Sequence, residues 1–197
     1  MGASGVALGG GASDMWWNPA LLASLSARSA QFTHTDLVEG IRQEYAAFGT
    51  GTSVGHIGIA VQLFDSGDID AYGDDASPLG SYSIKYTSLS ATYAGRFFDM
   101  VDIGATYKKL FEKVSEEDAG GYAVDAGIVV HTPIQGLTAG AAARNMGRMD
   151  ILRSERTKLP TDYSAGASWK GVIRGIERPF VTTAEYVAPR YGKKGVR

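Results

Sequence analysis

The chain has 197 residues, of which 44% are hydrophobic and 20% are charged, and its formal net charge is −2. The length suits one large all-β domain or two small ones. The small net charge gives no strong attraction to nucleic acid, which we exclude as a partner. No run of about 18 apolar residues occurs, so the sequence predicts no membrane-spanning helix.

Residues 1–28 differ from the rest of the chain. Met1–Ala12 is rich in glycine, alanine and serine and is predicted to be flexible. It is followed by Trp16, Trp17, Asn18 and Pro19, in which Pro19 can open a short helical turn capped by Asn18. The two adjacent tryptophans require burial. We therefore predict that residues 1–28 fold inward as a plug; the alternative is an amphipathic anchor at a membrane surface, where tryptophan is favoured.

Residues 29–197 alternate between apolar and polar side chains, with no convincing amphipathic helix among them. This rhythm predicts nine strands: Ser29–Thr35, Arg42–Gly49, Val54–Phe64, Ser88–Phe97, Val101–Lys113, Gly121–Val130, Leu137–Met146, Pro160–Trp169 and Pro179–Ala188.

The two faces of these strands have opposite character. In 54–64 the aliphatic residues share one face while small and polar residues share the other, and in 101–108 Val101, Ile103 and Tyr107 lie opposite Asp102 and Lys108. Alternate residues of a strand point to opposite sides of its sheet. The pattern is typical of a sheet between two solvents, of which one is water and the other is lipid.

The connections also alternate. Residues 50–53, 98–100 and 131–136 are short, whereas 65–87 and 147–159 are long and polar. Outer-membrane barrels have short periplasmic turns and long external loops, so we predict long loops outside and a periplasmic N-terminus. Nine strands is an odd number, while bacterial single-chain barrels have an even one. We therefore expect this chain to be the larger part of a longer barrel.

Several short stretches resemble one family of membrane proteins in the same order along nearly the whole chain. They are the Asn-Pro-Ala motif at 18–20, then 66–69, 104–108, 121–127, 145–147 and 159–163. The chain resembles the FadL-like outer-membrane barrels, and more closely their PorV/PorQ branch. The resemblance implies an antiparallel up-and-down barrel of about fourteen strands with an N-terminal plug.

The branches of this superfamily imply different functions. PorV-like members serve the type IX secretion system and hold exported proteins at the cell surface, and this is the role we expect. FadL-like members pass hydrophobic small molecules across the outer membrane, which is the first alternative. The expected partners are thus the lipid bilayer, secreted proteins or other secretion components, and hydrophobic small molecules.

Five charged residues fall on the polar face and are predicted to line the lumen: Arg96, Asp102, Asp125, Arg144 and Glu185. They would either form a path for substrate or ions, or fill the barrel with salt bridges that stiffen it. Aromatic residues gather near predicted strand ends, as at membrane interfaces, although strands favour aromatics in any case. These are Phe97, Phe98, Phe111, Tyr122, Trp169, Phe180 and Tyr186.

No cofactor, metal or catalytic site is predicted. The acidic stretch at 65–75 lacks the spacing of a calcium loop, because Leu79 occupies the position of its final glutamate. The three histidines are far apart, and no nucleophile elbow occurs. We expect a non-enzymatic protein of the outer membrane. A soluble β-sandwich that carries lipid, with its apolar faces packed together, is the second alternative.

Overall fold

The fold is all-β and antiparallel, with 68% of the chain in strands. The structure is a computed structural model that describes residues 5–152, 155–173, 178–191 and 195–196. Its short helices are η1 (Ala12–Trp16), η2 (Pro19–Ser24) and η3 (Val38–Gly40). The strands are β1 (Ser29–Asp36), β2 (Arg42–Thr52), β3 (Gly55–Asp65), β4 (Ile69–Tyr72), β5 (Pro78–Tyr82), β6 (Ile84–Phe97), β7 (Val101–Val114), β8 (Glu117–His131), β9 (Leu137–Met149), β10 (Ile151–Leu152), β11 (Glu155–Arg156), β12 (Asp162–Ile173), β13 (Arg178–Pro189) and β14 (Gly195–Val196).

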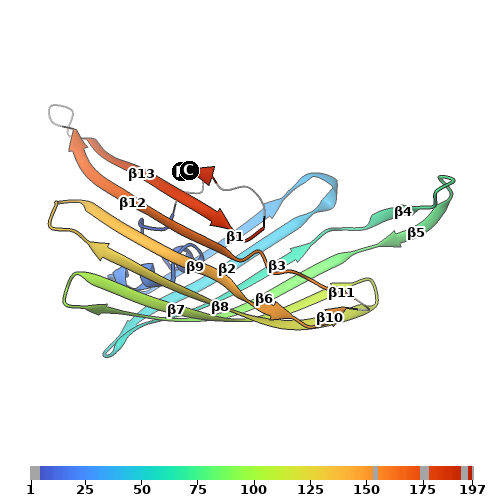
Figure 1. Cartoon of the computed structure of the whole chain (residues 1–197), viewed down its shortest axis with the longest axis horizontal. Coiled ribbons are helices and arrows are strands. Elements are labelled where there is room, and N and C mark those ends of the chain that lie inside the picture. Colours follow the sequence, from blue (N-terminus) through green and yellow to red (C-terminus); the bar gives the residue numbers. More distant parts are fainter. Residues whose placement is uncertain (1–4, 153–154, 174–177, 192–194, 197) are drawn as a thin grey trace.

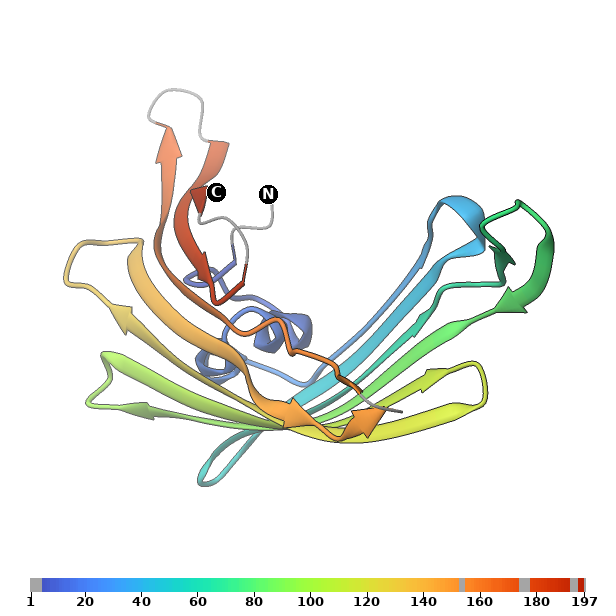
Figure 2. The same cartoon turned by 45° about the vertical axis from the view of Figure 1, so that its right-hand side comes forward.

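One sheet dominates the molecule. Its order is β1-β2-β3-β6-β7-β8-β9-β12-β13-β14, so each strand pairs with its neighbours along the chain once two small hairpins are set aside (Figure 1). The sheet bends into a trough, and the N-terminal helices lie in its concave side (Figure 2). All nine predicted strands are present, and most are longer than predicted. Closure into a barrel is not observed, since no pairing among the described residues joins β1 to β13 or β14.

The two long connections were wrongly predicted to be loops. Residues 65–87 contain the β4–β5 hairpin, which projects beyond the sheet (Figure 1), and the first residues of β6. Residues 147–159 contain the end of β9 and the short β10–β11 pair. Every residue of β5 is exposed and β4 is at most half-buried, so neither face of this ribbon is buried. A ribbon of this kind does not need the alternation of apolar and polar residues by which strands are predicted. The last two predicted strands extend toward each other, since β12 runs to Ile173 and β13 begins at Arg178, and residues 174–177 between them lie outside the described part.

The aliphatic stripes face outward, away from the rest of the protein. Ile59 is 62% exposed and Ile103 is 47% exposed, whereas Asp102 on the opposite face is completely buried. Thr106 and Lys108 of β7 are buried on the same inner face as Asp102. A β-sandwich would bury its apolar stripes under a second sheet. The described residues instead form one large sheet and two two-stranded sheets. Packing of two large sheets face to face is therefore absent from the described residues.

Residues 5–25 cover the inner face of the sheet. Pro19 opens η2 and Asn18 caps it by accepting a hydrogen bond from the Ala20 N–H, which confirms the predicted turn. The approach is close enough that a Cβ at Gly104 of β7 would clash with the backbone of Pro19 and Ala20. Glycine is therefore required there to let one backbone approach another.

The glycine-rich start of the chain was predicted to be flexible, but its described residues are packed. Val6 and Ala7 are buried and form a small core with Ala142 of β9. A side chain at Gly140 would collide with the Val6 backbone. The small residues here allow close contact with the sheet. The same composition, taken without that contact, predicts a flexible segment. Residues 1–4 of the predicted plug lie outside the described part.

Candidate functional site

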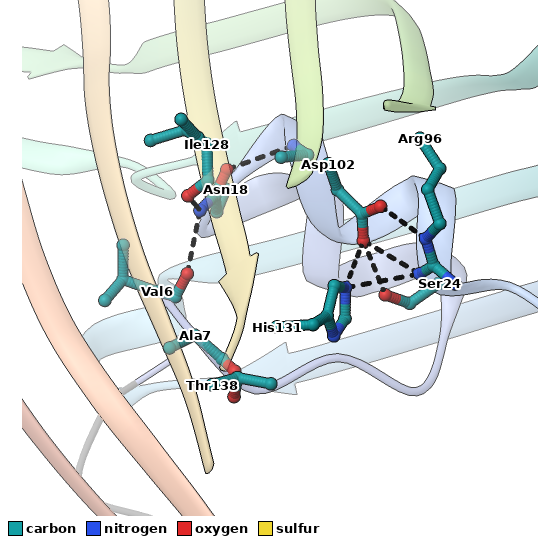
Figure 3. A network of polar contacts seen from close by, with 10 residues as sticks. Val6, Ala7, Asn18, Ser24, Arg96, Asp102, Ile128, His131 and Thr138 are labelled. Atoms are coloured by element: carbon teal, nitrogen blue, oxygen red, sulfur yellow. Dashed lines mark hydrogen bonds and ion pairs between the residues drawn. The ribbon is translucent and has the colours of Figure 1, made fainter. Parts of the chain in front are cut away.

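Asn18 is the central contact between the N-terminal segment and the sheet. It is completely buried, and its Nδ2 donates to the carbonyls of Val6 at 2.8 Å and Ile128 at 3.1 Å (Figure 3). The same Nδ2 lies 3.4 Å from the Ala141 carbonyl. Its Oδ1 accepts from the Ala20 N–H at 3.0 Å. A single side chain thus caps η2 and joins the segment to β8 and β9. A buried amide with all these partners fixes one geometry, because any displacement would leave polar groups unpaired.

Asp102 forms a second contact at one end of the segment. Its carboxylate accepts from Arg96 Nε at 2.7 Å and Nη2 at 3.0 Å, and lies 2.7 Å from His131 Nε2 (Figure 3). The Ser24 hydroxyl of η2 donates to the same Oδ2 at 3.3 Å. The same His131 Nε2 lies 3.2 Å from Arg96 Nη2, so the Arg96, Asp102 and His131 side chains form one cluster. Serine, histidine and aspartate therefore meet here.

This cluster does not have the geometry of a serine nucleophile. In a catalytic triad the serine bonds to one nitrogen of the histidine and the acid bonds to the other. Here Ser24 and His131 share one oxygen of Asp102, and no hydrogen bond joins Ser24 to His131 among the described residues. The arrangement holds η2 against β7 and does not polarise the hydroxyl for attack.

Asp125 forms a buried ion pair with Lys108 across β7 and β8. Lys108 Nζ lies 2.7 Å from Asp125 Oδ2 and donates to Asn145 Oδ1 at 2.8 Å. Asp125 Oδ1 accepts the Asn145 N–H at 2.7 Å, at a β-bulge where Asn145 has a φ of +56°. The ammonium also lies 5.1 Å from the centroid of the Trp16 ring, a cation–π contact with the N-terminal segment.

Arg144 and Glu185 contact the same segment. Arg144 forms a two-pronged pair with Asp162, donates from Nη1 to the Trp16 carbonyl at 3.2 Å, and stacks 5.4 Å from the Trp17 ring centroid. Glu185 Oε2 accepts the N–H groups of Gly5 at 2.8 Å and Val6 at 3.0 Å. The inner charges of the sheet are therefore used to hold residues 5–25.

A cavity of about 560 Å³ lies beside Trp16. The inner faces of β3, β6 and β7 form its floor, and residues 157–160 form its opposite wall. Glu112 of β7 is buried next to it, with its two oxygens accepting from the Tyr86 hydroxyl at 2.9 Å and the Thr157 hydroxyl at 2.7 Å. This volume falls in the range of small-molecule sites.

The structure brings together most of the residues that the sequence singled out. The five inward charges do lie on the inner face, and all except Arg96, whose side chain is 40% exposed, are buried. Within the N-terminal segment, contacts with that face are made by Trp16, Trp17, Asn18 and Pro19. Lys108, Glu112 and His131 were missed as site residues, although Lys108 and Glu112 have the same strand parity as Asp102 and could have been found by it.

No model of a protein family matches this sequence, and neither does any curated protein. In the described part of the chain, no helix is long and apolar enough to cross a membrane. The same residues contain no group of three or more histidine, aspartate or glutamate side chains placed to hold a metal ion.

Proposed function

We propose that this sheet is wall of an outer-membrane β-barrel of PorV/PorQ type, within the FadL-like superfamily, with residues 1–28 as its plug. One observation carries the proposal: aliphatic side chains are exposed on the outer face while charged side chains are buried on the inner face. A soluble protein in water has the reverse preference. In a barrel the outer face meets lipid, and charges in the interior pair with one another.

Replacing Ile59 by arginine tests this placement. A cation on the lipid face is expected to cost about 2–4 kcal/mol near the bilayer midplane. We expect Ile59→Arg to lower the fraction of protein that inserts into phospholipid vesicles, measured by flotation and by urea titration. The matched control is Leu79→Arg in the β4–β5 hairpin, where leucine is also exposed but projects beyond the sheet. Equal insertion of both variants, or wild-type protein that is monomeric and stable without detergent, would contradict the membrane assignment.

The function proposed first is surface binding of secreted proteins, as in the PorV-like branch. It is supported by the β4–β5 hairpin, which extends past the wall and exposes Tyr72, Leu79 and Tyr82. Exposed aromatic residues on a projecting ribbon are suited to carry the energy of a protein interface.

Replacing residues 69–82 by a short turn tests this role. The change removes the hairpin and leaves the ten-stranded sheet intact. We expect insertion into vesicles to be unchanged and retention of a reporter with the C-terminal signal domain of a secreted protein to fall roughly tenfold or more. Tyr72→Ser combined with Leu79→Ser, which keeps the ribbon, should show a smaller loss in the same retention assay. Full retention by the turn variant would argue against the role.

Passage of small hydrophobic molecules is the second candidate. The cavity beside Trp16 favours it, because Trp16 of the proposed plug and residues of the wall strands β3, β6 and β7 line it together.

A further inference from the structure

We propose that the cavity beside Trp16 binds an uncharged, mainly apolar small molecule and discriminates against anions. This inference rests on the second candidate function and names the class of molecule concerned. Eight of the cavity's fifteen lining residues are apolar or aromatic, among them Trp16, Phe64, Tyr86, Leu110, Met149 and Leu159. Burial of apolar ligand surface against such side chains is the main source of affinity at sites of this size.

The cation in the cavity wall is already neutralised. Lys108 is buried, and its ammonium is shared among Asp125 Oδ2, Asn145 Oδ1 and the face of Trp16. Its charge is balanced by the Asp125 carboxylate at 2.7 Å, and one of its three donors is used by Asn145. A ligand carboxylate would have to compete with Asp125 for this charge, and displacing Asp125 would leave that carboxylate buried without its partner. Lys108 is therefore not free to bind an anionic head group.

The nearest carboxylate adds a repulsive element. Glu112 is buried and has no ion pair with any described residue, and both of its oxygens accept from hydroxyls of cavity-lining residues. A ligand anion would lie in the field of this charge, where water does not screen it well. A ligand cation would lose its hydration on entering the cavity and would share this carboxylate with the Tyr86 and Thr157 hydroxyls. Lys158 also lines the cavity but is exposed, with its ammonium 5.5 Å from the Tyr191 ring centroid, so solvent screens its charge.

Three probes of one shape test the charge preference: 2-naphthol, 2-naphthoate and 2-naphthylmethylammonium. Each is titrated calorimetrically at neutral pH into the full chain in nonionic detergent micelles, with empty micelles as the blank. We expect 2-naphthol to bind at least about tenfold more tightly than either ion. Binding of 2-naphthoate as tight as that of 2-naphthol, tighter binding of the ammonium probe, or no binding above the blank would each overturn the inference.

Two variants assign the binding to this cavity. Ser88 lines the cavity from β6, so Ser88→Phe fills it and should weaken 2-naphthol binding roughly tenfold or more, whereas Leu89→Phe on the exposed opposite face should not. Glu112→Gln removes the repulsive charge and should raise the affinity for 2-naphthoate several-fold relative to 2-naphthol. Unchanged 2-naphthol binding by a folded Ser88→Phe variant would place the site elsewhere and refute the proposal.

The same preparations separate this inference from the proposed function. Vesicle insertion is measured on each protein sample, and titration in micelles does not require insertion. Wild-type protein that inserts but binds no probe refutes the cavity alone. Wild-type protein that binds 2-naphthol selectively but does not insert supports the cavity and refutes the membrane wall.

Discussion

Asn18→Ala is expected to lower the free energy of unfolding by about 2–6 kcal/mol and to release the N-terminal segment from the sheet. The substitution removes the side-chain acceptor of the Ala20 N–H and the donor to the Val6 carbonyl, both at buried positions. Each unsatisfied buried polar group costs about 1–3 kcal/mol, which gives this sum for two. Chemical denaturation in micelles measures the stability, and limited proteolysis within residues 5–25 measures the release.

Two further variants separate the roles of the Asn18 side chain. Asn18→Ser keeps an oxygen that can cap η2 but is too short to reach the sheet, so it should recover only part of the loss. Asn18→Asp keeps the shape but replaces the donor by a second oxygen facing the carbonyls of Val6 and Ile128, and it should be at least as destabilising as alanine. If the serine variant is as stable as the wild type, the contact with the sheet contributes little.

Asp125→Leu is expected to cost about 3–5 kcal/mol, because it leaves the Lys108 ammonium buried without a counter-charge. Lys108→Met should cost a similar amount for the converse reason. The double variant should recover most of this loss, since replacing both charges by apolar groups removes the penalty of each, but it should stay about 1–3 kcal/mol below the wild type because the Asn145 N–H loses its Asp125 acceptor. A double-mutant cycle by urea denaturation measures the coupling energy between the two side chains. We expect this energy to exceed that of an exposed pair.

The exposed pair of Lys85 and Asp65 provides the matched control. Its atoms are 3.3 Å apart, and its side chains are 56% and 42% exposed. Lys85→Met should therefore cost less than about 1 kcal/mol. Additive losses in the Lys108 and Asp125 variants would show that this pair behaves like a surface pair and that the inner face is open to water.

Features that depend on strand parity were predictable. The outward position of Ile59 and the inward position of Asp102 follow from alternation along one strand, and they hold wherever the strand pairs regularly. The capped turn at Asn18 and Pro19 is equally local, because the cap and the first helical residue are adjacent. The β4–β5 ribbon escaped prediction because both of its faces meet solvent.

Which residues pair with one another in the site was less predictable than which face of the sheet they lie on. Asp125 and Asn145 meet at a bulge, where two residues of β9 face one of β8 and parity no longer holds. The link between Glu185 and the Gly5 N–H spans nearly the whole chain, and no local pattern encodes it.

The amino-acid pattern alone specified an antiparallel all-β chain, the two unlike faces of its strands and the capped turn at Asn18, because these depend on neighbours one to three residues apart. The curvature of the sheet, the seating of residues 5–25 on it, the pairing of Lys108 with Asp125 and the cavity beside Trp16 were decided only in three dimensions. They require contacts between residues that are far apart in sequence, and many partners of the same charge and parity compete for each of them.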